Sequence, residues 1–278
     1  MTDAKADLPG FEERFAELRG WRVRYLVAGE GDPLLLVHGL GGSAANWVAL
    51  VPLLLPGRRL LVPDLPGHGG SSPLPAAPSL NGFADRIGLL LDGPTAVVGH
   101  SLGGAIALRL AIRWPELVNR LVLAGAAGIS SGTRRARYGL AITALLKPGR
   151  RIAPHRRLVG RSAALKTLVF GRWGAADPPA LPAEVAEAFL VGPERHTDTA
   201  SAAQALVRDD PRPDLDRVRC PTLLLWGARD NQLPVSDAFE YARRLRAPLR
   251  VIADCGHLLI GERPDACADA IASFLNER

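Results

Sequence analysis

The chain has 278 residues, of which 47% are hydrophobic and 22% charged, as in an ordinary globular protein. This composition excludes a disordered or fibrous protein, and the length suits one large α/β domain with a modest insertion. The formal net charge is +6 at pH 7, and a positive charge favours binding to nucleic acid or to membranes. The excess of basic residues is, however, concentrated in the middle of the chain.

Targeting signals and cysteines narrow the class further. Residues 1–10 lack the basic start and apolar run of an export signal, and the apolar runs are strand-sized, whereas a membrane span needs roughly 20 residues. The three cysteines, Cys220, Cys255 and Cys267, are an odd number without metal-ligand spacing. We therefore expect a cytoplasmic protein with no disulfide, metal or cofactor.

The predicted elements follow an α/β rhythm. A hairpin over residues 15–28, turning near Gly20, forms an antiparallel edge, and buried-strand patterns then alternate with helical ones, as in right-handed βαβ units of a parallel sheet. The predicted strands are residues 34–38, 60–63, 96–99, 121–124, 222–226 and 249–253, and the predicted helices are residues 44–55, 80–91, 102–113, 235–245 and 264–275.

The interval between the fourth and fifth of these parallel strands breaks the rhythm. It contains helical patterns but no buried strand, so we predict a helical cap at residues 128–214, inserted into a core made of residues 1–127 and 215–278. Within the cap, residues 134–172 hold eleven Lys or Arg and no acid, interleaved with leucines. This stretch is compatible with a solvated face, with an electropositive mouth for anionic substrates, or with weak contact to a membrane surface. No nucleic-acid motif accompanies it, so nucleic acid is not expected.

A candidate nucleophile lies between the strand at 96–99 and the next helix. Residues 99–104 read Gly-His-Ser-Leu-Gly-Gly, and a serine on a sharp strand-to-helix turn exposes its hydroxyl, while the glycines let strand and helix approach closely. Ser101 is therefore the predicted nucleophile. A serine hydroxyl is weakly nucleophilic, so it needs a histidine base and an acid that orients it.

His257 and Asp230 fit these two roles. Each follows an apolar strand near the C-terminus, at the edge of the sheet where α/β folds place functional groups, and they follow Ser101 in the order acid then histidine. Asp254 is only three residues from His257, too close along the chain to reach its Nδ1. Asp230 is therefore the predicted acid and His257 the base.

An oxyanion hole is predicted from a glycine-rich loop. Residues 38–42, His-Gly-Leu-Gly-Gly, follow the strand at 34–38, and backbone N–H groups of such loops hold the negative oxygen of a tetrahedral intermediate. The predicted donors are the N–H groups of Leu40 and Leu102. The loop lacks the Lys-Ser/Thr ending of a phosphate-binding P-loop.

Together with the turn-like segment 64–72 and with Glu262-Arg263-Pro264 after the histidine, these motifs resemble the α/β-hydrolase superfamily, in its esterase and lipase-like branch. The resemblance covers residues 31–126 and 221–275. It implies a mostly parallel eight-stranded sheet flanked by helices, with the cap inserted after strand 6.

The nucleophile and the oxyanion loop narrow the choice of hydrolase. Similar dehalogenases and epoxide hydrolases carry Asp at the nucleophile position, while proline iminopeptidases and carbon–carbon bond hydrolases tend to have Pro in the oxyanion loop, unlike residues 40–43. The resemblance thus implies a carboxylesterase that acts on a small-molecule ester through a Ser-His-Asp triad. A perhydrolase, lactonase or acyltransferase with the same triad, and a non-enzymatic ligand receptor with this fold, remain alternatives, and the oligomeric state is open.

Overall fold

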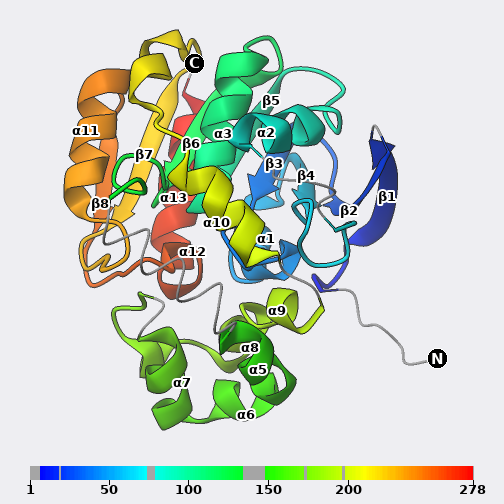
Figure 1. Cartoon of the computed structure of the whole chain (residues 1–278), viewed down its shortest axis with the longest axis vertical. Coiled ribbons are helices and arrows are strands. Elements are labelled where there is room, and N and C mark those ends of the chain that lie inside the picture. The colour runs from blue at the N-terminus through cyan, green and yellow to red at the C-terminus, as the bar shows by residue number, and fades with distance from the viewer. Residues whose placement is uncertain are drawn as a thin grey trace.

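The computed structural model describes residues 7–18, 20–73, 79–133, 148–171, 174–195 and 198–277. An eight-stranded sheet in the order β1-β2-β4-β3-β5-β6-β7-β8 crosses the molecule, with β1 and β8 at its two edges (Figure 1). The pairs β1–β2 and β2–β4 are antiparallel and the remaining pairs are parallel. The strands are β1 Glu12–Leu18, β2 Trp21–Ala28, β3 Asp32–Val37, β4 Arg58–Pro63, β5 Thr95–His100, β6 Val118–Ala124, β7 Thr222–Gly227 and β8 Leu249–Ile252.

Helices bury both faces of this sheet, which is why the central strands are apolar throughout. Successive residues of a strand point to opposite faces, so Leu34 and Leu36 pack into one core, and Leu35 and Val37 into the other. The first core is covered by η1, α1, α12 and α13, and the second by α2, α3 and α11. The mostly parallel eight-stranded fold and the antiparallel hairpin edge are both confirmed.

Most predicted helices are found close to their predicted bounds. The helices are α1 Val51–Leu54, α2 Leu80–Gly88, α3 Leu102–Arg113, α5 Pro148–Ile152, α6 Arg156–Arg161, α7 Ala163–Phe170, α8 Ala183–Ala188, α9 Val191–Arg195, α10 Thr199–Val207, α11 Val235–Leu245, α12 Leu259–Glu262 and α13 Pro264–Asn276, and the 3₁₀ turns are η1 Ala44–Trp47, η2 Ala153–His155, η3 Pro178–Ala180 and η4 Arg212–Arg217. The prediction of one continuous helix at residues 44–55 was wrong. It is divided into η1 and α1, because Pro52 in the first turn of α1 has no N–H to continue an incoming helix.

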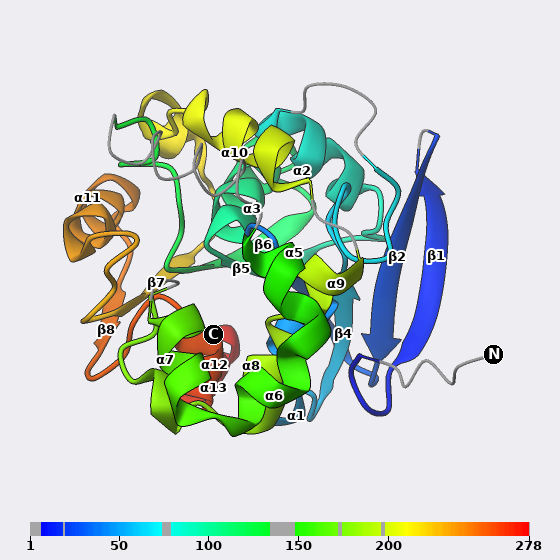
Figure 2. The same cartoon turned by 60° about the horizontal axis from the view of Figure 1, so that its bottom comes forward.

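The chain between β6 and β7 supplies a group of helices, α5 to α9, at one end of the sheet (Figures 1 and 2). Buried residues of this group, such as Val159 and Phe170, join the first core, whereas Ala202 and Leu206 of α10 join the second. The cap boundaries at 128 and 214 stay a prediction.

The described part of the basic stretch is mainly exposed. Arg150, Arg151, Arg157 and Arg161 face solvent, while the buried Lys166 donates to the carbonyls of Pro179 and Leu181, 2.5 and 2.6 Å away. Residues 134–147 and 172 lie outside the described residues. The roles considered for this stretch, weak membrane contact among them, stay predictions. No helix in the described ranges is long and apolar enough to cross a membrane.

A buried ion pair fixes the loops that follow β3 and β4. The fully buried Asp64 accepts the N–H of Ala44 at 2.7 Å and that of Gly70 at 2.7 Å, and it pairs with Arg24 of β2 at 2.9 Å. Arg24 also pairs with Asp7 at 2.8 Å. Burial lowers the pKa of Arg24, but the carboxylates of Asp64 and Asp7 more than offset this and hold it above its ordinary value. The guanidinium therefore stays charged in the interior.

We predict that Asp64→Asn lowers the free energy of unfolding by about 1–3 kcal/mol, because it removes a fully buried carboxylate partner of Arg24 and an acceptor of two backbone N–H groups, while the carboxylate of Asp7 stays beside the guanidinium. Urea titration followed by circular dichroism measures the change. The control is Asp92→Asn, since Asp92 is 87% exposed and lies 3.7 Å from Arg59; it should change stability by less than about 0.5 kcal/mol. Equal effects of the two substitutions would contradict the prediction.

Candidate active site

Ser101 occupies a strained turn between β5 and α3. Its backbone has φ 55° and ψ −117°, a conformation that residues other than glycine rarely adopt. The N–H of Ser101 donates to the carbonyl of Ala124 at 3.0 Å. Its carbonyl accepts the N–H of Ala127, also at 3.0 Å, as well as amides in the first turn of α3. The ends of β5, β6 and α3 thus hold the serine in this conformation.

Glycines allow the close contacts around this turn. A Cβ atom on Gly99 would lie 2.3 Å from the carbonyl oxygen of Gly103, and one on Gly103 would lie 2.1 Å from that of Val37. Both distances are shorter than carbon–oxygen contact permits. The expectation that side chains at these two positions would crowd the turn is confirmed.

The structure brings the three predicted triad residues together. Nδ1 of His257 lies 2.8 Å from Oδ2 of Asp230, and Nε2 of His257 lies 3.0 Å from Oγ of Ser101. With the proton on Nδ1 donated to the carboxylate, Nε2 is free to accept the serine proton. Asp230 is held in turn, because its Oδ1 accepts the N–H groups of Gln232 at 2.9 Å and Leu233 at 2.8 Å.

Asp254, the other acid near His257 in the sequence, points elsewhere. It pairs with Arg229 at 2.7 Å, and both side chains are exposed. The contact between Asp230 and His257 joins the loops that follow β7 and β8, which are neighbours in the sheet. Strand order therefore decides which acid reaches the histidine.

The glycine-rich loop 38–42 lies against the serine. A Cβ on Gly39 would be 3.1 Å from Cβ of Ser101, so the backbones are in contact. Among the described residues, no acceptor is found for the N–H of Leu40 or of Leu102. Leu102 opens α3, where a helix leaves its amides without acceptors and carries partial positive charge. The two predicted oxyanion donors are therefore available beside the nucleophile.

Two buried histidines brace these loops without charge. His38 donates from Nδ1 to the carbonyl of Gly39 at 2.8 Å and accepts the N–H of Leu65 at Nε2, 2.9 Å away. His100 donates from Nε2 to the carbonyl of His257 at 2.8 Å. Burial lowers the pKa of both, that of His100 to about 3 with a further contribution from His257. The contact of His100 with His257 spans 157 positions, so no local pattern in the sequence could indicate it.

The chain between β6 and β7 also contacts the site, at two points that no pattern in the sequence indicated. The N–H of His257 donates to the carbonyl of Gly174 at 2.6 Å, and a Cβ on Gly192 would lie 2.4 Å from the carbonyl oxygen of Gly42. One part of this chain thus touches the histidine loop and another touches the oxyanion loop. His257 is consequently buried, with 8% of its surface exposed.

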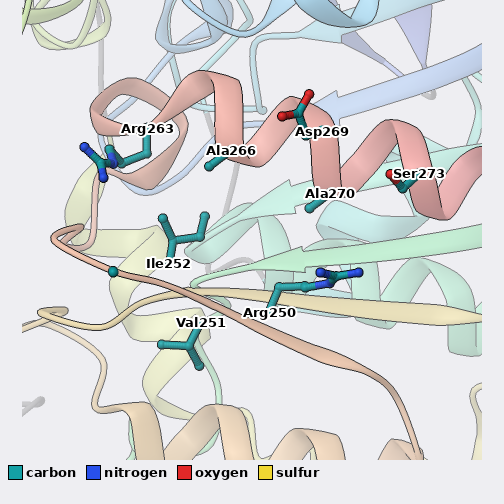
Figure 3. A pocket seen from close by; sticks show the side chains of 9 residues that line it. Arg250, Val251, Ile252, Arg263, Ala266, Asp269, Ala270 and Ser273 are labelled. Atoms are coloured by element: carbon teal, nitrogen blue, oxygen red, sulfur yellow. The ribbon is translucent and has the colours of Figure 1, made fainter.

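A pocket of about 410 Å³ lies elsewhere, between β8 and α13 (Figure 3). Its walls include Arg250, Ile252, Arg263 and Asp269, and the triad is not among its lining residues. The arginines at its two ends do not converge on one point (Figure 3). Within the described ranges, no group of three or more His, Cys, Asp or Glu side chains is placed to hold a metal ion.

Comparison with known proteins places this site in a family. The family model "Alpha/beta hydrolase family" matches residues 34–270. The chain is 32% identical to a 2-hydroxymuconate semialdehyde hydrolase of Pseudomonas sp. (strain CF600), over 93% of this chain and 92% of the relative. It is 35% identical to a pimeloyl-[acyl-carrier protein] methyl ester esterase of Aromatoleum aromaticum, over 84% and 94%.

Among solved structures, a hydrolase from Pseudomonas aeruginosa superposes with a TM-score of 0.77 and 28% identity, over 96% of this chain and 99% of that one. The chain belongs to the α/β hydrolase family. The predicted resemblance is confirmed, and the relatives include both an esterase and a hydrolase of a semialdehyde.

Because His100 is neutral in the folded protein, we predict that the free energy of unfolding decreases in acid. The pKa of His100 falls from 6.5 to about 3 on folding, so only the unfolded chain takes up this proton between those values, and stability is lost as pH falls through that window. From pH 7.5 to pH 5 this contributes about 2 kcal/mol. His100→Gln keeps an N–H donor and should lose about 2 kcal/mol less than wild type over that interval in urea titrations.

The exposed His155 provides the control for this experiment. His155→Gln should leave the pH dependence of wild type unchanged. The same dependence in wild type and His100→Gln would show that His100 does not contribute.

Proposed function

We propose that the protein is a serine hydrolase that cleaves a carboxylic ester of a small molecule. One observation carries the proposal: Nδ1 of His257 donates to Asp230 at 2.8 Å, and Nε2 of His257 accepts the hydroxyl of Ser101 at 3.0 Å, with that serine in a strained turn. A hydroxyl next to a base and close to the N–H groups of Leu40 and Leu102 has the parts that acyl transfer requires.

In the proposed mechanism Ser101 attacks the ester carbonyl while Nε2 of His257 takes its proton. Asp230 stabilises the imidazolium, and the N–H groups of Leu40 and Leu102 donate to the oxyanion. His257 then protonates the leaving alcohol, which gives an acyl-enzyme on Ser101. A water molecule, deprotonated by His257, then attacks this acyl group. The bond between the acyl carbon and Oγ of Ser101 breaks, His257 returns the proton to Oγ, and the acid is released.

A second candidate is the hydrolysis of a carbon–carbon bond, and it is favoured by the relative named a 2-hydroxymuconate semialdehyde hydrolase. Such a compound contains neither an ester nor an amide, so its hydrolysis breaks a carbon–carbon bond. Ser101, with the help of His257 and Asp230, can also attack an aldehyde or ketone carbonyl, but the leaving group is then a carbon atom that must receive a proton. The leaving group of an ester is an oxygen atom, which Nε2 of His257 can protonate directly. The esterase relative is 35% identical over 84% of this chain, and the semialdehyde hydrolase is 32% identical over 93%.

We predict that wild type hydrolyses p-nitrophenyl esters of some acyl length and that Ser101→Ala lowers kcat by several orders of magnitude, as loss of a triad nucleophile does elsewhere. The rate of p-nitrophenolate release measures this. Ser273→Ala, which changes an exposed serine of α13, should keep the wild-type rate. Inactive wild type on every ester, or a fully active Ser101→Ala variant, would refute the ester proposal.

The same preparation separates the two candidate functions. The comparison substrate is 2-hydroxy-6-oxo-2,4-heptadienoate, which has no ester or amide, so that its hydrolysis breaks a carbon–carbon bond. Under the ester proposal, kcat/KM for the best ester exceeds kcat/KM for this compound. The reverse order would favour the second candidate. Addition of hydrogen peroxide or of a competing alcohol to the ester assay tests for peracid or for a new ester, the products of a perhydrolase or an acyltransferase.

A further inference from the structure

Glu262 has a half-buried carboxylate group that bonds to three backbone amides. It ends the short helix α12, five residues after His257. Oε2 accepts the N–H of Gly256 at 3.1 Å and that of Ala176 at 2.7 Å, and Oε1 accepts the N–H of Leu258 at 3.1 Å. One side chain thus satisfies three amides from two distant parts of the chain.

Two of these amides flank the proposed base. Gly256 and Leu258 are the neighbours of His257, whose own N–H donates to Gly174 and whose carbonyl accepts from His100. The backbone on both sides of the imidazole is therefore fixed by hydrogen bonds. The distance from Nε2 of His257 to Oγ of Ser101 depends on this backbone. Glu262 therefore influences the geometry of the proposed triad without touching the reacting atoms.

The third amide belongs to the chain between β6 and β7. Ala176 and Gly174 lie on either side of the buried Ala175, and a Cβ on Gly256 would lie 1.9 Å from the carbonyl oxygen of Gly174. The two backbone segments are in direct contact, and Glu262 bridges them. A movement of residues 174–176 would therefore be transmitted to the histidine loop.

Only a carboxylate suits this position. Burial raises the pKa of Glu262, and the N–H groups of Ala176, Gly256 and Leu258 act in the opposite direction by stabilising the charged form. An amide of the same size has one acceptor oxygen, and its NH₂ group would face an N–H donor. Glu262→Gln thus keeps the volume and removes at least one of the three bonds.

We propose that Glu262 is a positioning residue that locks the His257 loop to residues 174–176, so that the proposed base and the chain covering the site are held as one unit. The inference rests on the proposed role of His257. It assigns Glu262 no contact with substrate.

The kinetic test uses Glu262→Gln in the full-length protein with the best p-nitrophenyl ester. We expect kcat to fall by roughly 10- to 100-fold, because small misplacements of a catalytic group cost rates of this order, while KM changes less. Glu262→Asp, which keeps the carboxylate, should recover part of the rate. Glu184→Gln, at an exposed glutamate of α8, should behave as wild type.

A second measurement separates positioning from general stability and does not need turnover. Hydrogen exchange followed by NMR should show faster exchange at the amides of Ala176, Gly256 and Leu258 in Glu262→Gln, with exchange in α13 unchanged. In a His257→Ala background, Glu262→Gln should cause no further loss of the residual rate.

The outcomes distinguish this inference from the proposed function. Glu262→Gln could show faster exchange at the three amides while wild type hydrolyses no ester. This result would support the proposed positioning role of Glu262 and refute the ester proposal. Unchanged kcat together with unchanged exchange would overturn the positioning role of Glu262. A fall in kcat accompanied by faster exchange throughout the protein would overturn it as well. If Glu262→Gln does not fold, the same measurements on Glu262→Asp decide the matter, with a smaller expected change.

Discussion

The backbone of Ser101 is the constraint on which the site depends. A non-glycine residue at φ 55° costs roughly 1–3 kcal/mol, and such a conformation persists only where the surroundings impose it. Here α3 approaches β5 at Gly99 and β3 at Gly103 so closely that neither glycine leaves space for a Cβ. The end of β6, the loop after it and the first turn of α3 bond to the serine backbone. This conformation turns the hydroxyl toward His257 and places it next to the N–H of Leu102 at the start of α3, for which no acceptor is found among the described residues.

The remaining groups come from other strands of the same sheet. The loops after β3, β7 and β8 bring Leu40, Asp230 and His257 to the edge where Ser101 lies, because parallel strands end together. Neutral groups support these loops close to the triad, where His38 and His100 donate to carbonyls. The ion pair of Arg24 and Asp64 holds the loops after β3 and β4 from within the core. A cation beside His257 would oppose the imidazolium that forms during attack, and a buried uncharged histidine does not.

Much of this arrangement could be predicted from the sequence, because it rests on local signals. The turn at 99–104, the order of serine, acid and histidine, and the apolar strands are each visible within a few residues. Parallel topology then implies that their ends meet, which brings Ser101 and His257 together across 156 positions. The break at Pro52 was also a local signal, but the apolar pattern of residues 44–55 outweighed it in the prediction. The bonds of Gly174 and Ala176 to the His257 loop could not be predicted, since they join irregular segments with no periodic pattern.

The central claim is that catalysis passes through a covalent bond to Ser101. Rapid acid quenching during the first turnover of an activated ester, followed by mass spectrometry of the intact protein and its peptides, tests this directly. The account predicts a mass increase equal to the acyl group on the peptide containing Ser101, formed within the first turnover and lost at the rate of steady-state hydrolysis. Steady turnover with the acyl group on another residue, or with no adduct under conditions where deacylation limits the rate, would contradict it.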